Sequence, residues 1–500
     1  MMNTGKVWLV GAGPYDEGLM TLKGADVLKK ADVVVYDSLV GTGILQMMPE
    51  HAKKIDVGKK AGNHKVVQEE INRILLEEAK KGGRIVRLKG GDPFLFGRGG
   101  EELELLQENG IPFEVVPGVT SAIAVAAYAG IPVTHRDFTS SLHIITAHKK
   151  KGSSEPVDFR SLAALGDATL VFLMGIGELE NICSGLMEAG MPPETPAAVL
   201  EKGTSPRQRR VVADLLTLPE KARLAAAGTP GIIIVGKVCS LAEKFHWAED
   251  RILGGARVII TRPKAKNSEL AERLCELGAE VIKLPAIQTA PVDFGDAWEM
   301  AEKRIGDYDW IVFTSDAAVD SFFSHLSRIR QDIRTLGGIR FAAIGNATRK
   351  AVESHGVLVE YMPESYNGKA LGEGLSGLVQ KGRRVLAFAP KGTRSDAVSV
   401  LEEKGIPCDI IEAYETLYVK GEGIEPEPDD LVVFTSASTV RGFAMAMEGR
   451  DIAGMKAVCI GEQTGREAEA HGMEIAVSKE ATIDSLVDKV IEVNLQGFRE

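Results

Sequence analysis

The segment 87–98 reads R-L-K-G-G-D-P-F-L-F-G-R and is the most informative part of the chain. Gly90 and Gly91 follow a strand-like apolar run, and glycines at such a position let the backbone approach a ligand closely. Asp92 can accept hydrogen bonds from ammonium or hydroxyl donors. A tight turn in which Asp92 caps a helix would explain the same residues. This segment alone therefore leaves a binding loop and a plain turn both open.

Short strand-like runs alternate with helical patterns on both sides of this segment, which is typical of an α/β protein. The opening strand, around Val7–Val10, runs into the loop Gly11–Pro14. A dinucleotide-binding loop would need a third glycine at position 16, where the chain has Asp16. Pro14 also lacks the N–H group that a phosphate would use. The loop therefore favours a ligand other than NAD.

Composition excludes several classes of protein. A chain of 500 residues exceeds what one hydrophobic core usually organises, and 44% apolar with 26% charged residues is ordinary for globular domains. The net charge of −11 gives no general attraction to nucleic acid or to an anionic membrane. An anionic ligand would therefore need local basic groups and backbone N–H donors.

Cysteine and histidine spacing indicates no metal site. The five cysteines and nine histidines show neither zinc-ligand spacing nor a disulfide framework. The apolar run 122–133 is too short to cross a bilayer and predicts a buried helix. The first residues lack a basic region followed by a clean apolar stretch. We therefore expect a cytoplasmic protein with no metal, membrane or nucleic-acid partner.

The alternation of strands and helices breaks near residues 246–256. A polar stretch ends one unit there, and Gly254-Gly255 precedes a new strand at Arg257–Ile260. This break predicts a first domain of residues 1–246, a linker of residues 247–256 and a second domain of residues 257–500.

The second half contains an internal repeat. The tripeptide Phe-Thr-Ser ending at Ser315 recurs ending at Ser436, and a helical apolar stripe follows each copy. The stripes are Val319, Phe322, Phe323 and Leu326, and Val440, Phe443, Ala444 and Met447. Further on, Ile344–Thr348 is echoed by Ile460–Thr464, and a His-Gly pair follows each. Features repeated in this order predict duplicated α/β lobes with a ligand between them.

The first half resembles the uroporphyrinogen-III C-methyltransferase family over nearly its whole length. The ordered motifs are Val10–Pro14, Ala31–Asp37, Val57–His64, Gly90–Pro93, Val116–Ser121, Gly130–Arg136, Phe172–Gly175 and Glu201–Thr204. This resemblance implies the tetrapyrrole-methylase fold, in which two α/β lobes hold S-adenosylmethionine between them. The chain departs from the family's Gly-Pro-Gly-Asp-Pro at Gly13–Glu17, and has Thr-Ala-His at 146–148 where many relatives have Thr-Gly-His.

The same resemblance implies a cofactor site and two acid/base groups. The cofactor contacts would be Pro14, Gly90, Gly91, Asp92, Leu95, Thr120, Ser121, Met174 and Gly203. Asp37 is implied as the proton acceptor and Lys59 as the proton donor. Considered alone, Asp37 could be a helix cap, Lys59 a solvated side chain, and Leu95 and Met174 plain core residues.

The implied substrate carries eight carboxylates. Arg98 and Arg136 stand inside family motifs and are candidates to bind them, because a guanidinium group grips a carboxylate with two hydrogen bonds. The region 207–210 is a weaker candidate.

The second half resembles uroporphyrinogen-III synthase. The matching pieces are Ile259–Pro263, the two Phe-Thr-Ser turns, the two Ile-Gly-x-x-Thr turns and Glu412–Thr416. The resemblance implies two lobes joined by two strands, near Pro285–Pro291 and Glu412–Val419. Lobe one would comprise residues 257–287 and 418–500, and lobe two residues 291–412.

The synthase resemblance implies Tyr414 as a proton donor to the leaving hydroxyl group, and Arg262 is a candidate to hold a carboxylate. Four hydroxyl side chains stand where strands pass into helix N-termini, which are good sites for carboxylate arms. They are Thr314, Ser315, Thr435 and Ser436. Ordinary helix caps would explain them equally well, and a surface role would explain Arg262.

Together the two resemblances imply a multifunctional enzyme of porphyrin biosynthesis. It would convert hydroxymethylbilane to uroporphyrinogen III with inversion of the last ring, and methylate that product twice to precorrin-2, for sirohaem or cobalamin biosynthesis. The alternatives are another methyltransferase of the cobalamin pathway and a non-catalytic tetrapyrrole-binding protein. The resemblance also suggests a homodimer formed through the methyltransferase half.

Overall fold

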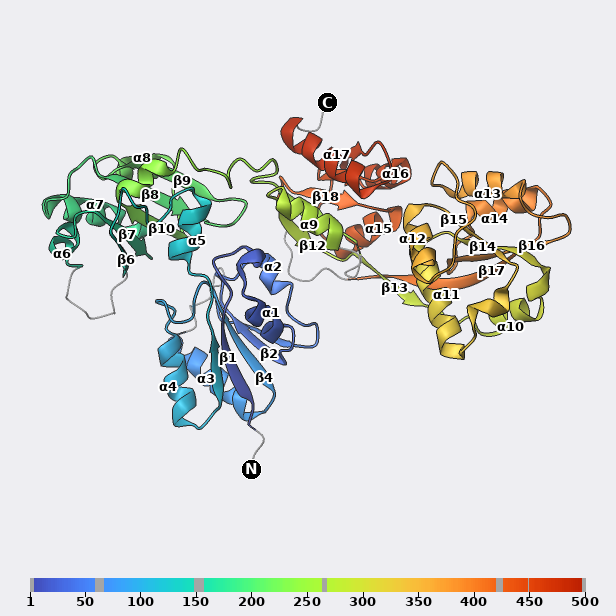
Figure 1. Ribbon diagram of the computed structural model, residues 1–500, viewed down its shortest axis with the longest axis horizontal. Helices are drawn as coiled ribbons and strands as arrows, with labels where there is room; N and C mark the ends of the chain where they lie inside the picture. The colour runs from blue at the N-terminus through green and yellow to red at the C-terminus, as the bar shows by residue number, and fades with distance from the viewer. Residues whose placement is uncertain are drawn as a thin grey trace. The chain divides into compact units, whose positions relative to one another are not determined.

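The computed structural model describes residues 4–58, 67–147, 157–262, 268–419, 426–447 and 449–496 (Figure 1). These residues form four five-stranded sheets with helices packed on them, which confirms the α/β class expected from the sequence. The chain divides into two compact units, Met1–Val258 with Ala271–Ile282, and Ile259–Leu270 with Lys283–Glu500. Each sheet is described by itself. No helix in the described ranges is long and apolar enough to span a membrane.

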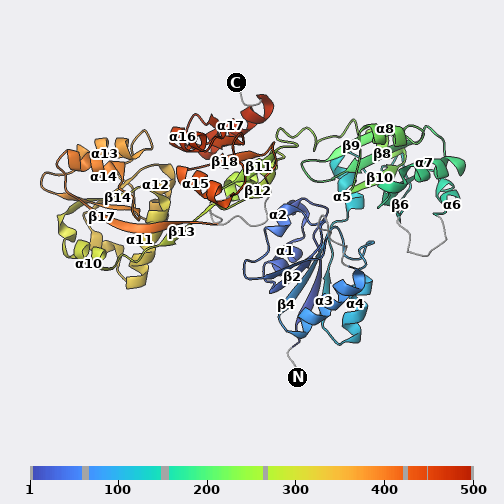
Figure 2. The ribbon, with the colours of Figure 1, turned by 180° about the vertical axis from the view of Figure 1, so that it is seen from behind.

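The first sheet is parallel and has the strand order β3-β2-β4-β1-β5. Its strands are β1 (Lys6–Gly11), β2 (Val33–Tyr36), β3 (Lys53–Asp56), β4 (Arg84–Lys89) and β5 (Phe113–Val116). A short helix, η1 (Glu17–Leu19), and α1 (Leu22–Leu28) follow β1, and α2 (Thr42–Leu45) follows β2. Helices α3 (Gln68–Lys80) and α4 (Gly99–Glu108) cover the face opposite α1 and α2 (Figure 2).

Alternation along β1 explains the two layers of helices. Val7 and Leu9 pack in the core with Leu75 and Leu106 of α3 and α4. Trp8 and Val10 point the other way and pack with residues of α1 and α2. Because all five strands run the same way, the loops that follow their carboxyl ends collect at one edge of the sheet, the usual place for a ligand site.

The second sheet has the order β6-β7-β10-β8-β9, with β6 and β7 parallel and the other pairs antiparallel. Its strands are β6 (Ser141–Thr146), β7 (Ala168–Leu173), β8 (Pro196–Glu201), β9 (Arg209–Asp214) and β10 (Gly231–Val235). Helix α5 (Ser121–Tyr128) and η3 (Lys237–Leu241) cover one face. Helices α6 (Phe159–Ala163), α7 (Leu179–Glu188) and α8 (Leu218–Leu224) cover the other face, and η2 (Ile176–Glu178) precedes α7.

Helix α5 ties the first two sheets together. It begins just after β5 of the first sheet, and its Ala122 and Val125 are buried against Leu200 and Ile232 of the second sheet. The helix expected in the apolar run 122–133 is therefore confirmed as far as Tyr128, with Ile123 exposed, while residues 129–133 lie outside it. The N-terminus of α5 lies where the two lobes of the first half meet.

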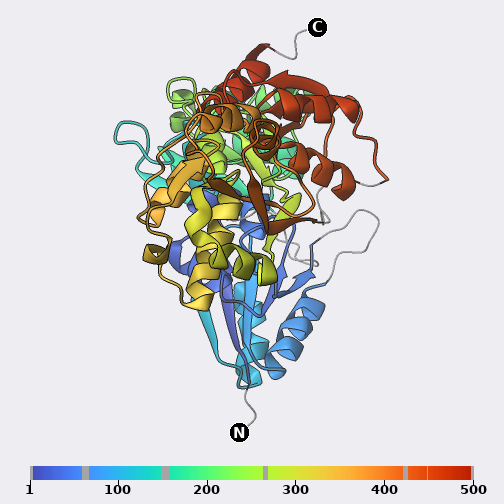
Figure 3. The same cartoon turned by 90° about the vertical axis from the view of Figure 1, so that its right-hand side faces the viewer.

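The third sheet has the order β12-β11-β18-β19-β20. Its strands are β11 (Arg257–Ile260), β12 (Glu280–Lys283), β18 (Leu431–Phe434), β19 (Lys456–Cys459) and β20 (Glu474–Val477). Its helices are α9 (Ser268–Glu276), α15 (Ala437–Ala446), α16 (Glu462–Ala470) and α17 (Ile483–Gln496), the last three being the red helices of Figure 3.

The fourth sheet has the order β13-β17-β16-β14-β15. Its strands are β13 (Ile287–Pro291), β14 (Tyr308–Phe313), β15 (Arg340–Ala343), β16 (Arg384–Pro390) and β17 (Cys408–Tyr418). Its helices are α10 (Gly295–Lys303), η5 (Ile305–Asp307), α11 (Asp316–Ile329), η6 (Ile333–Leu336), α12 (Asn346–Ser354), α13 (Gly368–Ser376) and α14 (Asp396–Glu403). Strands β13 and β17 are antiparallel and overlap the two segments expected to link the lobes, except for residues 285, 286 and 419, which lie just outside the strands.

The structure confirms the internal repeat. Ser315 follows β14 and is the N-cap of α11, while Ser436 follows β18 and is the N-cap of α15. Gly345 and Gly461 occupy the matching N-cap positions of α12 and α16. The apolar stripes of α11 and α15 face their cores, as the sequence predicted, except that Phe323 and Ala444 are only partly buried. The domain and lobe limits themselves stay predictions.

Candidate functional site

Three glycine loops interlock at the carboxyl edge of the first sheet. Gly11 ends β1, Gly91 follows β4 and Gly118 follows β5. A Cβ atom on Gly11 would lie 2.5 Å from Gly118 Cα and 2.7 Å from Gly91 O. Gly13 and Gly91 also exchange backbone hydrogen bonds, of 3.2 Å from Gly13 N and 2.7 Å from Gly91 N. The three backbones pack so closely that neither Gly11 nor Gly118 has room for a side chain.

Asp92 stabilises the contact between these glycine loops through hydrogen bonds. Its Oδ1 accepts hydrogen bonds from the N–H groups of Phe94 and Leu95, at 2.8 and 3.1 Å, and its Oδ2 accepts one from Gly118 at 3.0 Å. Helix α4 begins only after Arg98, so the helix-cap interpretation of Asp92 is wrong. The carboxylate instead holds its own loop and ties it to the loop after β5.

The remaining expected cofactor contacts come from both lobes. Thr120 is the N-cap of α5 and accepts a hydrogen bond from Ala122 N at 3.3 Å, and Ser121 is the first residue of that helix. Gly203 packs against α5, since a Cβ there would collide with the Val125 side chain. Pro14 and Leu95 are both partly buried.

Met174 lies at the end of β7 and is 52% exposed, so the plain-core interpretation is wrong for this residue. Its backbone φ of +56° turns the chain away from the sheet at that point. A non-glycine residue in this conformation is uncommon, and strained backbone of this kind recurs at binding and active sites.

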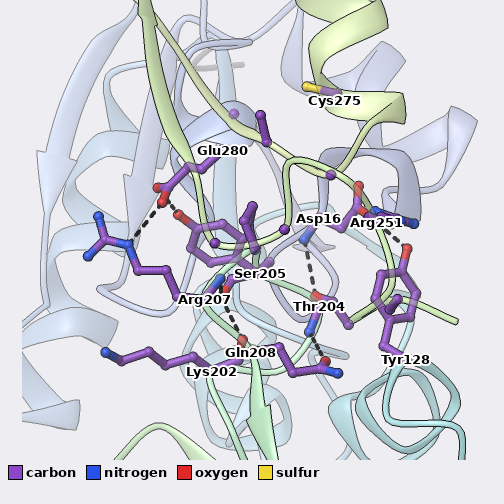
Figure 4. Close-up of a pocket in the computed structure, with 18 of the residues that line it drawn as sticks. Asp16, Tyr128, Lys202, Thr204, Ser205, Arg207, Gln208, Arg251, Cys275 and Glu280 are labelled. Atoms are coloured by element: carbon purple, nitrogen blue, oxygen red, sulfur yellow. Dashed lines mark hydrogen bonds and ion pairs between the residues drawn. The ribbon is translucent and has the colours of Figure 1, made fainter. Parts of the chain in front are cut away.

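Asp16 joins the first loop to the second lobe (Figure 4). Its backbone N–H donates to Thr204 Oγ1 at 3.3 Å, and its Oδ2 accepts a hydrogen bond from the Tyr128 hydroxyl at 2.8 Å. Burial raises the pKa of Tyr128 to about 12, and the bond to Asp16 adds to the shift. The loops of Pro14 and Gly203 are thereby brought together. The sequence analysis had named Asp16 as a departure from a dinucleotide motif and as part of the Gly13–Glu17 loop, and gave it no role in the site.

Asp37 lies directly after β2 at the same edge of the first sheet. Its Oδ1 accepts a hydrogen bond from Leu39 N at 3.1 Å, and its Oδ2 lies 3.4 Å from Arg87 Nη2. Helix α2 is capped by Gly41, so the helix-cap interpretation of Asp37 is wrong. Lys59, the other expected acid/base residue, lies outside the described residues.

The two expected substrate arginines differ in their surroundings. Arg98 is exposed and forms a double hydrogen bond with Glu101, of 3.0 Å from Nε and 2.6 Å from Nη2, which raises its pKa. Arg136 is exposed and makes no ion pair within the described part of the chain. In the weaker region, Arg210 donates to the carbonyl groups of Ala129 and Ala242, which is a structural role.

In the second half, Tyr414 and Ser315 are brought together. Tyr414 lies on β17 and is 8% exposed. Burial raises the pKa of Tyr414, a side-chain hydrogen bond with Ser315 lowers it, and the charge of Asp316 raises it. Burial lowers the pKa of Arg262, while Asp316 and Glu269 raise it. Asp316, which sequence reasoning missed, therefore acts on both Tyr414 and Arg262.

The four hydroxyl residues occupy strand-to-helix turns, as expected. Ser315 and Ser436 both cap helices. Their Oγ atoms accept hydrogen bonds from the N–H groups of Ala318 and Thr439, at 3.2 and 3.3 Å. Thr314 donates to Phe388 O at 3.3 Å, and Thr435 follows β18 directly. The cap interpretation of both serines is confirmed, and a hydroxyl that caps a helix still leaves neighbouring N–H groups for an anion.

The described ranges contain no group of three or more His, Cys, Asp or Glu side chains that could hold a metal ion. The candidate chemistry thus lies in two places. The first half has a cofactor-type site of backbone, hydroxyl and carboxylate groups, and the second half has a buried tyrosine beside the N-terminus of α11.

Comparison with known proteins gives two family matches. The model of the tetrapyrrole (corrin/porphyrin) methylases matches residues 6–219, and that of uroporphyrinogen-III synthase HemD matches residues 268–488. The porphyrin biosynthesis protein HemD of Ruminiclostridium josui is 44% identical over 498 residues, which cover 98% of this chain and 99% of the relative.

Two further relatives match the first half. A siroheme synthase of Escherichia coli (strain K12 / DH10B) is 52% identical over 243 residues, or 49% of this chain and 52% of that enzyme. The crystal structure of uroporphyrin III C-methyl transferase from Thermus thermophilus is 40% identical, covers 47% of this chain and 100% of its own, and has a TM-score of 0.41.

Proposed function

We propose a defined pair of reactions, because the chain belongs to the tetrapyrrole methylases in its first half and to the uroporphyrinogen-III synthases in its second. It thus joins two activities of tetrapyrrole biosynthesis. The second half converts hydroxymethylbilane to uroporphyrinogen III. The first half then methylates that product twice from S-adenosylmethionine to give precorrin-2. The observation that carries the methylation is the meeting of Asp37, the Gly90–Asp92 loop and the N-terminus of α5 at one edge of a parallel sheet.

The residues present fit S-adenosylmethionine. A Cβ on Gly91 would meet nothing within 4 Å, so the backbone there is open to close approach by a ligand. Met174 presents an exposed thioether, and Thr120 and Ser121 present hydroxyl groups. We assign the nine expected contacts, from Pro14 to Gly203, to this cofactor. When bound, it supplies an electrophilic methyl group.

The protein's part in the methylation is positioning and proton transfer. In the proposal, Asp37 accepts the pyrrole N–H proton, which pushes electron density onto the ring carbon that attacks the methyl group. Lys59 is proposed as the proton donor. Arg98 and Arg136 would grip carboxylate arms, and Arg98 would exchange Glu101 for the substrate. In-line alignment of carbon and methyl group then supplies much of the rate.

In the second half, Tyr414 is proposed to protonate the leaving hydroxyl of hydroxymethylbilane. A phenol is protonated at neutral pH and so carries a proton to give, and the hydrogen bond with Ser315, which lowers the pKa of Tyr414, partly offsets the effect of burial, which raises it. Arg262, Thr314, Ser315, Thr435 and Ser436 would bind the acetate and propionate arms. Holding these arms folds the bilane so that its last ring can invert before closure.

A single incubation tests the proposal. The full chain with hydroxymethylbilane and S-adenosylmethionine should yield precorrin-2, identified by the mass of two added methyl groups, and without S-adenosylmethionine it should yield uroporphyrinogen III. Heat-denatured protein is the control for spontaneous closure to the type I isomer. Only type I product would overturn the synthase assignment, and unmethylated type III product would overturn the methyltransferase assignment.

Asp92→Ala should weaken S-adenosylmethionine binding by about 1.5–3 kcal/mol, or roughly one to two decades in affinity. The reason is that three backbone N–H groups lose their acceptor and the crossing of loops loosens. Isothermal calorimetry measures the affinity, with the exposed Asp26→Ala of α1 as the matched control. An unchanged affinity in folded Asp92→Ala protein would remove Asp92 from the site.

Tyr414→Phe should slow formation of the type III isomer by about tenfold and raise the share of type I product. The expected loss is smaller than for most acid/base groups because many backbone donors also position the bilane. Chromatography separates the isomers. The control is Tyr418→Phe, on the same strand and 41% exposed. A wild-type isomer ratio in Tyr414→Phe would show that the phenol is not the donor.

The domain limits, the homodimer through the methyltransferase half and the cytoplasmic location stay predictions, as does the branch, sirohaem or cobalamin, that uses the product.

A further inference from the structure

A buried network of charges lies behind Asp37, on the face of the first sheet that α3 and α4 cover. Arg87 and Lys89 belong to β4, and Glu102 belongs to α4. Their side chains are 4%, 5% and 0% exposed, whereas that of Asp37, at the end of the network, is 24% exposed. Charges buried to this extent require opposite charges and hydrogen bonds to compensate them.

Glu102 is the inner anchor of the network. Its Oε1 accepts hydrogen bonds from Gln68 Nε2 at 3.1 Å, Arg87 Nε at 3.2 Å and Lys89 Nζ at 2.7 Å. Its Oε2 is buried and has no hydrogen-bond partner among the described residues. Burial and then the charge of Arg87 lower the pKa of Lys89, while Glu102 and Asp37 raise it. Two cations and two carboxylates leave the network electrically neutral.

Arg87 carries the network from this anchor to the edge of the sheet. Its Nη1 donates to Val35 O at 3.4 Å and to Leu88 O at 3.0 Å, and its Nη2 reaches Asp37 Oδ2 at 3.4 Å. A planar guanidinium that is fixed at Nε and Nη1 has little freedom left at Nη2. The position of Asp37 is therefore coupled to Glu102 through one side chain.

Attachment of α4 to the sheet would not require this arrangement. The bonds from Glu102 to Lys89 and Gln68 already join α4 to β4 and α3. Only Arg87 extends past the β2 backbone to a carboxylate that is partly open to solvent. The Arg87 guanidinium group thus binds Asp37 at the edge of the sheet as well as Glu102 in the core.

We propose that Arg87 is a positioning residue for methylation, which holds the Asp37 carboxylate in place while Glu102 and Lys89 hold Arg87. The inference rests on the proposed function, in which Asp37 accepts the substrate proton. In this proposal Arg87 acts through the Asp37 carboxylate, which it holds by Nη2, and not by binding cofactor or substrate itself. Its loss should therefore lower kcat and leave binding of both ligands nearly unchanged.

A double-mutant cycle on the full chain tests this, with uroporphyrinogen III and S-adenosylmethionine as substrates. Arg87→Lys keeps the charge but cannot span from Glu102 to Asp37, and should lower kcat about tenfold with KM and cofactor Kd within about twofold of wild type. In an Asp37→Asn background the same change should have less than about a twofold further effect. Arg84→Lys is the matched control, since Arg84 lies on β4 over the Trp8 ring and outside the network.

The outcomes separate this inference from the proposed function. If the losses in kcat caused by Arg87→Lys and by Asp37→Asn multiply in the double mutant, Arg87 does not act through Asp37. The inference is then overturned while the proposed function stands. If the wild type fails to methylate uroporphyrinogen III, the function falls and the inference falls with it. If the Arg87→Lys protein does not fold, Glu102→Gln is the variant that tests the inference. It should show the same loss in kcat alone, and a parallel loss of cofactor affinity would overturn the inference.

Discussion

Asp37→Asn should slow methylation of uroporphyrinogen III by about a hundredfold or more, the usual size for a lost acid/base group. Asparagine keeps the side-chain oxygen that accepts the Leu39 N–H bond, so the turn after β2 should survive. Its amide has no basic oxygen and cannot take up the substrate proton. Initial rates with saturating S-adenosylmethionine measure the effect, and calorimetry should show cofactor affinity within about twofold of wild type.

The matched control for this variant is Asp32→Asn. Asp32 precedes the same strand, at the edge of the sheet away from the site, and accepts one backbone N–H bond from Arg84 at 2.8 Å. It should retain wild-type turnover. If Asp37→Asn also turned over at the wild-type rate but unfolded at a lower temperature, Asp37 would serve only the turn, and its assignment as proton acceptor would fail.

Gly118→Ala should lower the free energy of unfolding of the methylase half by about 3 kcal/mol, at the upper end for overpacking. The added methyl group would lie 2.7 Å from Gly11 Cα and would collide with Gly91 O. Both obstacles are backbone, which cannot turn aside as a flexible side chain can. The loops after β1, β4 and β5 must therefore separate, and binding of S-adenosylmethionine should be lost with them.

Urea unfolding and calorimetry measure the two effects of Gly118→Ala. Gly100→Ala is the control, because a Cβ at Gly100, inside α4, would meet nothing within 4 Å. That variant should be neutral or slightly stabilising, since alanine favours the helix. Wild-type stability and affinity in Gly118→Ala would contradict the interlocking of the three loops.

The repeat in the second half shows what sequence patterns could predict. Ser315 and Ser436 precede apolar stripes with helical spacing, so both the helices and their buried faces could be derived from local chemistry. The order of strands in the sheets could not, because it depends on pairings between segments far apart in the chain. Strands β11 and β18, for example, are neighbours although the whole fourth sheet lies between them in the sequence.

The residues of the candidate cofactor site could be named from the sequence, but the contacts between them could not. The glycines indicated loops whose backbone approaches a ligand or another segment closely. No local pattern predicts that Gly11 contacts Gly118 or that Asp92 accepts a hydrogen bond from Gly118 N. Methionine is usually buried, but Met174 is 52% exposed and has a positive φ, which its residue type does not predict. The charged Arg87 and Lys89 in the buried part of β4 were a signal for the buried network, but Glu102 could not be identified from spacing.

The interrupted third sheet has a consequence for synthesis of the protein. Strands β11 and β12 leave the ribosome before the rest of the third sheet. Strand β18, the other neighbour of β11, follows only after the whole fourth sheet, and its Val433 O accepts a 2.9 Å hydrogen bond from Thr261 Oγ1. The fourth sheet is continuous in sequence from β13 to β17 and can fold on emergence. Until β18 arrives, the nascent chain presents β11 with an unpaired edge, which is where we expect chaperones to bind.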